Sequence, residues 1–410
     1  MQPDHGNTGE IDTTTEPPPP YALDGGTSLL ARLRTLRDRH PVHQDPATGA
    51  WSVLRYDDVA AASSDWSTYS AELWRAYPEE WGKGDAWSQG RLTETDPPRH
   101  RLLRTLIGKA FTTRTVAALA PGIERTVTDL LDAVADRDEF DLARDLADPL
   151  PVTVIADLIG LPPQDHALFR GWADGLLSFE AGDLQGEDLV KAIDAAGAEL
   201  IAYLREHYRR RRAHPRDDLF SRLATAEVEG RTLTEDEVVN LGKLLLIGGH
   251  VTTACSLGSL VQSLLEHPTA LAEVRADPAL VPAAVEEAVR HRPAVLTSLR
   301  LTTRETTLSG VTIPARQFVS LSLLSANHDE RRFTDPERFD IHRKPNQHLG
   351  FGQGIHYCLG APLARLEIAT ALTALLRRFT SIERTDAPLR YYRNPSIAGL
   401  KEFPVAVRRT

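Results

Sequence analysis

The stretch Phe351-Gly352-Gln353-Gly354-Ile355-His356-Tyr357-Cys358-Leu359-Gly360 is the most informative part of this 410-residue chain. It places a single cysteine between glycines, which can adopt positive φ and let the backbone approach a flat ligand closely. After Cys358, apolar side chains recur at helical spacing, with a proline in the first predicted turn. Cys358 is therefore predicted to lie near a helix N-terminus, where free N–H groups and the helix dipole favour an anionic sulfur.

A single thiolate beneath a flat ligand indicates a haem iron held by cysteine, an arrangement that promotes cleavage of the O–O bond. The alternative is a glycine-rich turn that contains an incidental buried cysteine. Cys255 is the only other cysteine, and no group of His and Cys has the spacing of a structural zinc site. A disulfide framework is equally unsupported, so a cytoplasmic location is expected.

Composition and charge narrow the function classes further. A hydrophobic content of 41% supports a substantial core, and a formal net charge of −10 argues against general nucleic-acid binding. No apolar run reaches the ~20 residues that cross a bilayer, so we expect no membrane attachment. Residues 1–27, which include Pro17-Pro18-Pro19-Pro20, are predicted to be a disordered or extended lead-in to one domain over residues 28–410.

The hydrophobic pattern indicates a mainly α fold with small β-sheets. Residues 42–53 are expected to form a hairpin, and residues 298–324 are expected to form strands with a turn at Ser309-Gly310. Helical periodicity dominates between about residues 97 and 290. Helices are predicted at residues 115–134, 151–161, 189–212 and 234–267, and again after Cys358.

The longest predicted helix begins at Thr234, where Glu237 completes a capping box, and ends before Pro268. Its centre reads Gly248-Gly249-His250-Val251-Thr252-Thr253, and two glycines cost about 1 kcal/mol each relative to alanine in a helix. Such a turn leaves room for a ligand, which the hydroxyl of Thr252 would face. The alternative is close helix–helix packing through glycine, with threonine hydroxyls that bond back to carbonyls.

The stretch around Cys358 resembles the haem-binding loop of the cytochrome P450 family, Phe-Gly-x-Gly-x-His-x-Cys-x-Gly, at every fixed position. The resemblance covers nearly the whole chain from about residue 28. It implies a single-domain cytochrome P450-like fold with a long central helix over the haem, haem b (iron protoporphyrin IX) as cofactor, and Cys358 as the metal ligand. Phe351, Gly352, His356 and Gly360 would then contact the cofactor.

The centre of the long helix is similar to the oxygen-activating element of this family, Ala/Gly-Gly-x-Asp/Glu-Thr-Thr. Gly248 and Gly249 fit the small pair, and Thr252 fits the alcohol that steadies bound oxygen. Val251 stands where the family has a carboxylate, and a valine cannot relay protons. Proton delivery would then use water, a substrate group, or His250 if its ring turns inward.

Further basic residues match the family's haem anchors. His100 and Arg104 share one face of a predicted helix, a spacing that on its own often marks a solvated face. The family uses His-x-x-x-Arg at this place for a haem propionate, and Arg300 fits its propionate arginine, with His356 in the same network. Buried propionates need such partners because unpaired charges are costly away from water.

The pair Glu287 and Arg290 resembles the Glu-x-x-Arg of the family, which pairs with an arginine in the later irregular stretch. Arg338 is predicted to be that third member, with Arg343 as the alternative. We expect this triad to be structural and to support the loop of Cys358.

The resemblance also indicates which segments line a substrate pocket. The loop before His100 is rich in large rings and acidic side chains, which would suit a bulky ligand with a basic group. The alternative is a lid that packs on itself. The predicted pocket residues are Trp74, Trp81, Trp87, Val295, Leu296 and Ile397.

These features predict a haem-thiolate monooxygenase that inserts one oxygen atom from O2 into a bulky organic substrate, and the resemblance associates such enzymes with natural-product biosynthesis. The chain has no flavin or iron–sulfur segment, so electrons are expected from a separate ferredoxin and ferredoxin reductase. Oxidative coupling or peroxide-driven oxidation on the same fold is an alternative. A haem-binding sensor or carrier without turnover is another.

Overall fold

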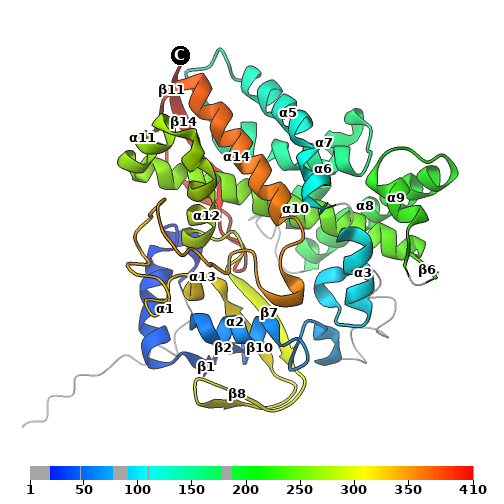
Figure 1. Cartoon of the computed structure of the whole chain (residues 1–410), viewed down its shortest axis with the longest axis vertical. Helices are drawn as coiled ribbons and strands as arrows, with labels where there is room; N and C mark the ends of the chain where they lie inside the picture. The colour runs from blue at the N-terminus through cyan, green and yellow to red at the C-terminus, as the bar shows by residue number, and fades with distance from the viewer. Residues whose placement is uncertain are drawn as a thin grey trace, which may run out of the picture.

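The computed structural model describes residues 19–46, 48–76, 91–108, 111–177, 187–228 and 230–409. Helices make up most of the described chain, and the five-stranded sheet lies in the lower part of the view in Figure 1, where α1 and α2 lie beside it. The predicted class, mainly α with small β-sheets, is confirmed. The α-helices of the described residues are α1 (Thr27–Arg39), α2 (Tyr56–Ser64), α3 (Arg99–Gly108), α4 (Thr113–Ala117), α5 (Ala120–Asp132), α6 (Pro149–Leu158), α7 (His166–Leu177), α8 (Glu187–Ala213), α9 (Leu219–Thr225), α10 (Glu235–Glu266), α11 (Pro268–Ala276), α12 (Val281–His291), α13 (Leu323–Asn327) and α14 (Ala361–Arg378).

The strands form one five-stranded sheet and several smaller ones. The largest has the order β1-β2-β10-β7-β3, with β1 (Val42–Gln44), β2 (Trp51–Val53), β10 (Phe318–Ser322), β7 (Thr297–Thr302) and β3 (Tyr69–Ser70). A second has the order β11-β14-β4, with β11 (Phe379–Arg384), β14 (Pro404–Arg409) and β4 (Glu139–Asp141). The two-stranded pairs are β5 (Glu227–Val228) with β6 (Arg231–Thr232), β8 (Thr306–Leu308) with β9 (Val311–Ile313), and β12 (Arg390–Tyr391) with β13 (Leu400–Glu402).

The predicted strand regions have the expected pairing. β1 and β2 form an antiparallel hairpin in which Val42 faces Val53. Ser309 and Gly310 join β8 to β9 and have φ of 44° and 78°. A two-residue hairpin loop needs positive φ at both positions so that its twist matches the right-handed twist of the strands. β7 runs antiparallel to β10 and contributes Arg300 opposite Val319, which places the predicted propionate arginine in a central strand.

The expected lead-in over residues 1–27 needs a correction at its C-terminal end. The described part begins at Pro19 and forms the 3₁₀-helix η1 (Tyr21–Leu23). The Tyr21 ring is 5% exposed and packs edge-on against Tyr391, with ring centroids 5.7 Å apart. Burial of this ring against the C-terminal segment orders the chain before α1, and residues 1–18 lie outside the described part.

α10 forms the central element around which the other helices pack. The Thr234 hydroxyl accepts from the Glu237 N–H at 3.2 Å, and the Glu237 carboxylate accepts from the Thr234 N–H at 2.8 Å, so the predicted capping box is present. The same carboxylate pairs with Arg99 of α3 at 3.0 Å. α10 contacts α6, α8, α12 and α14, and in Figure 1 it crosses the middle of the molecule behind α14.

One expectation about membranes is corrected by α10. Glu235–Glu266 is long and apolar enough, by length and composition, to cross a membrane, although no such run was expected. Of its most apolar 18-residue window, 67% is buried inside the fold. Because helices of the same domain cover this surface, its apolar character is that of a core helix.

Candidate active site

The loop that carries Cys358 is held by its glycines. Gly352 and Gly354 have φ of +72°, a region that favours glycine. A Cβ on Gly354 would lie 2.6 Å from the Ser63 carbonyl oxygen of α2, so only glycine permits this approach. The Cys358 N–H donates to the Phe351 carbonyl at 2.8 Å. These contacts fix the cysteine three residues before α14, as the sequence predicted.

The sulfur of Cys358 lies at the N-terminal end of α14. Burial raises the pKa of the Cys358 thiol, whereas hydrogen bonds from the N–H groups of Gly360 and Ala361 and the charge of Arg104 lower it. The net direction is upward, and a metal cation bound at the sulfur would favour the thiolate form. Gly360 has φ of −81°, and a Cβ there would meet no atom within 4 Å, so the space next to this residue is open.

Cys358 lines a cavity of about 370 Å³ whose walls come from distant parts of the chain. α10 contributes Gly248, Gly249 and Thr252, and α14 contributes Leu363 and Glu367. The cavity also receives the side chains of four basic residues from α3, β7 and the cysteine loop. These residues are His100, Arg104, Arg300 and His356.

The four basic residues lack anionic partners among the described side chains, apart from one distant carboxylate. His100 is 3% exposed and Arg300 is 8% exposed, yet Arg300 donates only to the Ser298 hydroxyl and the Leu299 carbonyl. The Nε2 atoms of His100 and His356 are buried without hydrogen-bond partners. Asp96 is 3.8 Å from His356 Nε2. Such a cluster is suited to a ligand that brings its own negative charge.

The centre of α10 supports both interpretations of its glycines. A Cβ on Gly249 would lie 2.9 Å from Cδ1 of Ile155 on α6, so this glycine allows close helix packing. A Cβ on Gly248 would meet only Leu244, at 3.9 Å, which leaves the cavity side open. The Thr252 hydroxyl donates to the Gly248 carbonyl at 2.7 Å while lining the cavity. Its lone pairs remain free to accept from a ligand.

Neither His250 nor Val251 lines the cavity. Val251 is 3% exposed and packs in an apolar cluster with Cys255, Ala294 and Ile397. His250 is 0% exposed, and both of its ring nitrogens are buried without a side-chain partner. Burial and the charge of Arg170 lower the pKa of His250 to about 4. The idea that His250 turns inward is therefore wrong for this structure.

The structural triad contains Arg343 where we predicted Arg338. The Arg290 guanidinium makes two bonds of 2.8 Å to the Glu287 carboxylate, and both side chains are fully buried. Arg343 Nε donates to Glu287 at 3.2 Å. Arg338 is exposed and contributes only its carbonyl, which accepts from Arg290 and Arg343. The choice of Arg338 was wrong, because the irregular chain turns its side chain to solvent.

The predicted substrate residues are only partly brought to the cavity. Val295 lines it, as does the neighbouring Ala294. Leu296 packs instead with Tyr21, Leu324 and Ala398 and does not line the cavity. Ile397 pairs with Val295 through a β-bridge and faces the Val251 cluster. Trp74, in η2 (Leu73–Ala76), is not a lining residue, and Trp81 and Trp87 lie outside the described residues.

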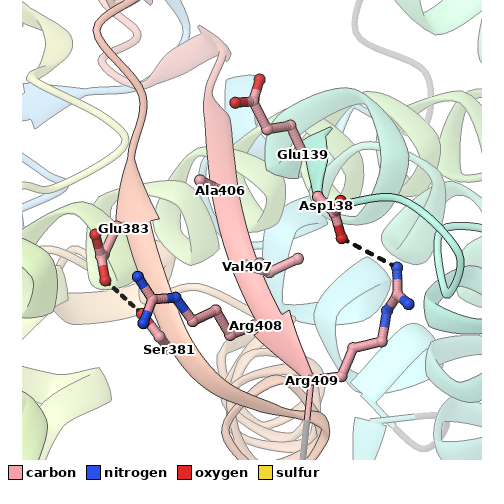
Figure 2. A pocket seen from close by; sticks show the side chains of 8 residues that line it. All are labelled: Asp138, Glu139, Ser381, Glu383, Ala406, Val407, Arg408 and Arg409. Atoms are coloured by element: carbon pink, nitrogen blue, oxygen red, sulfur yellow. Dashed lines mark hydrogen bonds and ion pairs between the residues drawn. The ribbon is translucent and has the colours of Figure 1, made fainter.

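A larger hollow elsewhere has different properties. Figure 2 shows an open depression of about 510 Å³ on β4, β11 and β14. Its charged side chains are exposed and are partly paired with one another, as in the contact of 3.3 Å between Arg409 and Asp138. We place the active site in the smaller cavity, because it is lined by a cysteine sulfur and by buried basic side chains, which the depression on the strands lacks.

Comparison with protein families decides the class of this site. Residues 183–402 match the family described as cytochrome P450. The chain belongs to the cytochrome P450 family. It is 52% identical over 390 residues to cyclomarin C epoxidase CymV of Salinispora arenicola, covering 95% of this chain and 98% of that protein. It is 42% identical to erythromycin C-12 hydroxylase of Saccharopolyspora erythraea, covering 92% and 94%.

Solved cytochrome P450 structures share the whole fold. Ligand-free cytochrome P450 TbtJ1 superposes with a TM-score of 0.86 at 47% identity, covering 94% of this chain and 98% of that chain. The open form of cytochrome P450 EryK from S. erythraea gives 0.89 at 39% identity, covering 96% and 99%. The protein is thus a cytochrome P450 monooxygenase, and its family uses a haem-iron cofactor, small-molecule substrates and redox partners.

The cavity of this cytochrome P450 fits a haem group. Cys358 supplies a soft ligand for iron, and the unpartnered His100 and His356 nitrogens, with Arg104 and Arg300, supply donors for carboxylates. Phe351, Gly352 and Gly360 line the cavity on the cysteine side. The fit rests on the buried Nε2 atoms of His100 and His356, which form no hydrogen bond among the described residues.

Two residues with bearing on the site were not singled out from the sequence. Asp96 is 4% exposed and accepts from the Ser70 hydroxyl and the Ala71 N–H, which places its carboxylate beside His356. Glu367 is 1% exposed and lines the cavity. Its position on the apolar face of α14, four residues after Leu363, was a visible anomaly in the helical pattern.

Proposed function

We propose that this cytochrome P450 binds haem b through Cys358 and oxygenates a bulky natural product. The observation that supports this most strongly is the convergence of one cysteine sulfur, four basic side chains and the weakened turn of α10 on a single cavity. The same chain segment that carries Cys358 also carries His356, so ligation and anchoring are coupled through one short loop.

Each residue has a physical task in this proposal. Haem iron held by a thiolate, when bound, supplies the oxidising chemistry, including cleavage of the O–O bond. His100, Arg104, Arg300 and His356 donate to its carboxylates and fix its orientation. Gly248 leaves space above it, Gly249 packs α10 against α6, and the Thr252 hydroxyl orients water and oxygen beside it. Glu287, Arg290 and Arg343 hold the irregular chain that leads to the cysteine loop.

The substrate is proposed to lie against α10 and the segment after α12. Leu244, Leu245, Ala294 and Val295 provide an apolar surface there, with the Ser298 hydroxyl at its edge. Relatives named as a cyclomarin C epoxidase and an erythromycin C-12 hydroxylase support epoxidation or hydroxylation of a large secondary metabolite. Glu367 is the only carboxyl among the described lining residues, so the described walls offer a basic group on the substrate no second acidic partner.

Partners and location follow from the same proposal. Electrons would come from a ferredoxin and its reductase, and the site of action would be the cytoplasm. The single domain would cover residues 28–410 together with the ordered segment that begins at Pro19.

Reconstitution with oxygen-18 gas tests this function. The haem-loaded protein is supplied with a ferredoxin, its reductase and NAD(P)H, and a panel of large secondary metabolites is screened by the spin-state change of the haem. We expect a binder to become a product that has gained one labelled oxygen atom. Product that forms only with added peroxide, or by coupling of two substrate molecules without oxygen gain, would instead support the alternative chemistries. A bound ligand that never raises electron consumption would support a sensor or carrier.

A further inference from the structure

Val251 belongs to a buried cluster that supports one wall of the haem cavity. Its side chain is 3% exposed and lies in one apolar cluster with Cys255, one turn further along α10, and with Ala294. Val251 does not line the cavity, but Ala294 and its neighbour Val295 do. Ala294 is therefore a member of both the cluster and the wall, and it links this part of α10 to the space that a substrate would occupy.

The segment that contains Ala294 is joined to the C-terminal segment by backbone hydrogen bonds. The Leu296 N–H donates to the Ser396 carbonyl at 2.9 Å, and the Ala398 N–H donates to the Ala294 carbonyl at 2.8 Å. A β-bridge lies between these two hydrogen bonds. Because the two segments are paired, a displacement of one of them carries the other along.

The paired segments pack closely against α10. A Cβ on Gly399 would overlap the Cys255 sulfur, so the chain approaches the helix as closely as a glycine allows. Ile397 belongs to the same cluster as Val251. The side chains of Val251, Ala294 and Ile397 contain no polar atom, so shape and volume decide how they meet. Protein interiors are close-packed, and a change of even one methylene group in such a contact displaces its neighbours.

We propose that Val251 is a positioning residue that determines substrate specificity, because its side chain sets the place of the wall formed by Ala294 and Val295. Its two methyl groups hold the paired segments at a fixed distance from α10, and this distance fixes the width of the cavity at that wall. The position at which the family has a carboxylate thus has a packing role in this chain.

The same wall indicates the kind of group that the substrate presents to it. The side chains of Ala294 and Val295 are apolar, so the part of the substrate that lies against them is an uncharged alkyl, alkenyl or aryl group. This inference rests on the proposed function and adds how the cavity selects its substrate by size.

The first test compares the binding of imidazoles of graded size to the ferric, haem-loaded protein. Imidazole that carries a methyl, phenyl or biphenyl group binds the iron through nitrogen, and the shift of the Soret band gives each Kd. In Val251→Ala the wall can recede, so we expect the ratio of the biphenyl Kd to the methyl Kd to fall about tenfold, as for about one methylene group in an apolar pocket. In Val251→Ile, which adds a methylene group, the ratio should rise.

Val261→Ala is the matched control for Val251→Ala. Val261 also lies on α10 and is also 3% exposed, but it belongs to the main core cluster and does not line the cavity. Both alanine variants should lower the melting temperature to a similar extent, because each removes the same buried methyl groups. Only Val251→Ala should change the ratio of the two Kd values.

Two outcomes would overturn the proposal. One is an equal ratio in the unsubstituted protein, Val251→Ala and Val251→Ile, and the other is an equal change of the ratio in Val261→Ala. If Val251→Ala does not fold, Val251→Ile decides alone, since an unchanged ratio in that variant contradicts a wall whose place depends on the size of this side chain.

Val251→Thr separates the volume of the side chain from its polarity. Threonine has nearly the shape of valine, and its hydroxyl can donate to the carbonyl one turn earlier in a helix. We expect the ratio of Kd values in Val251→Thr to match that of the unsubstituted protein. A ratio that changes in Val251→Thr as it does in Val251→Ala would show that volume is not the cause, and it would contradict the inference.

The proposed function and the role of Val251 fail separately. If the unsubstituted protein does not show thiolate ligation in its reduced, carbon-monoxide-bound spectrum, the proposed function fails. If that spectrum is intact in the unsubstituted protein and in the variants, but the ratio of Kd values does not follow the size of the side chain, only the role of Val251 fails.

Discussion

The imidazole rings of His100 and His356 meet edge to face, with centroids 4.6 Å apart, although one lies on α3 and the other in the cysteine loop. The Nε2 atoms of both rings are buried without hydrogen-bond partners. Burial and the nearby charges of His356 and Arg104 lower the pKa of His100 to about 4. An anionic ligand between these groups would accept a hydrogen bond from each ring. Such a ligand would offset the cost of burying two ring nitrogens without hydrogen-bond partners.

Arg300→Leu tests the anchoring of that ligand. Arg300 is buried on β7 and donates only to neutral oxygens, so the charge gains a full partner when a haem carboxylate binds. A hydrogen bond to a charged group contributes about 1.5–3 kcal/mol, and we therefore expect haem affinity to fall roughly 10- to 100-fold. Haem transfer to an acceptor protein measures the change. Arg304→Leu, on the exposed side of the same segment, is the matched control, and equal losses in both variants would contradict the assignment.

Arg343→Ala tests the corrected triad. Arg343 Nε donates to the buried Glu287 carboxylate, whereas the Arg338 side chain is exposed. Removing one partner of a buried ion network costs about 3–5 kcal/mol, and we expect that loss in the free energy of unfolding for Arg343→Ala. Arg338→Ala should change it by less than about 1 kcal/mol, because its backbone carbonyl remains. Denaturant unfolding of the two variants decides, and the reverse order of effects would restore Arg338 to the triad.

His250→Leu separates a structural histidine from a proton relay. The folded pKa of His250 is about 4, below the ~6.5 of an unfolded chain. The unfolded protein therefore binds more protons between these values, and the free energy of unfolding falls as pH drops from about 6.5 to 4. We expect His250→Leu to make this fall shallower by about 3 kcal/mol at pH 4, with product formed per electron unchanged.

His214→Leu, at an exposed position after α8, serves as the control for His250. It should leave the acid limb of the stability curve as it is. A large drop in coupling in His250→Leu, with an unchanged pH profile of stability, would show that the ring does take part in proton delivery.

Val251→Glu tests whether the family's carboxylate can be restored. The new side chain would enter the apolar cluster of Cys255, Ala294 and Ile397, where an unpaired carboxyl costs roughly 2–5 kcal/mol. We expect lower stability, and altered coupling of electrons to product because the strained side chain disturbs the turn that carries Thr252. Thermal unfolding and the ratio of product to NAD(P)H consumed measure the two effects, with Val251→Gln as the uncharged control. A variant of full stability and unchanged coupling would refute this expectation.

Most of the fold and the metal ligand could be predicted from short stretches of the sequence. The capping box at Thr234, the turn at Ser309-Gly310 and the helix after Cys358 each depend on residues within a few positions of one another, so their chemistry is visible in the sequence. The cysteine loop is of the same kind, because its glycines have to permit φ of +72° and a close approach to α2.

The features that could not be predicted from the sequence depend on contacts between distant parts of the chain. Whether Arg338 or Arg343 reaches Glu287 depends on the path of an irregular segment, which no periodicity describes. Val295 and Leu296 are neighbours that point to opposite sides, and only the tertiary contacts decide which one faces the cavity. Glu367 was hidden for a related reason, since a carboxyl on an apolar helix face becomes informative only when no partner is found for it.

The measurement that tests the central claim most directly is the optical spectrum of the reduced, carbon-monoxide-bound protein and of its Cys358→Ser variant. We predict a strongly red-shifted Soret band in the unsubstituted protein, because Cys358 thiolate is the axial ligand, and loss of that band in the variant. A band at the position typical of histidine-ligated haem in the unsubstituted protein, or a red-shifted band that persists in Cys358→Ser, would contradict the account.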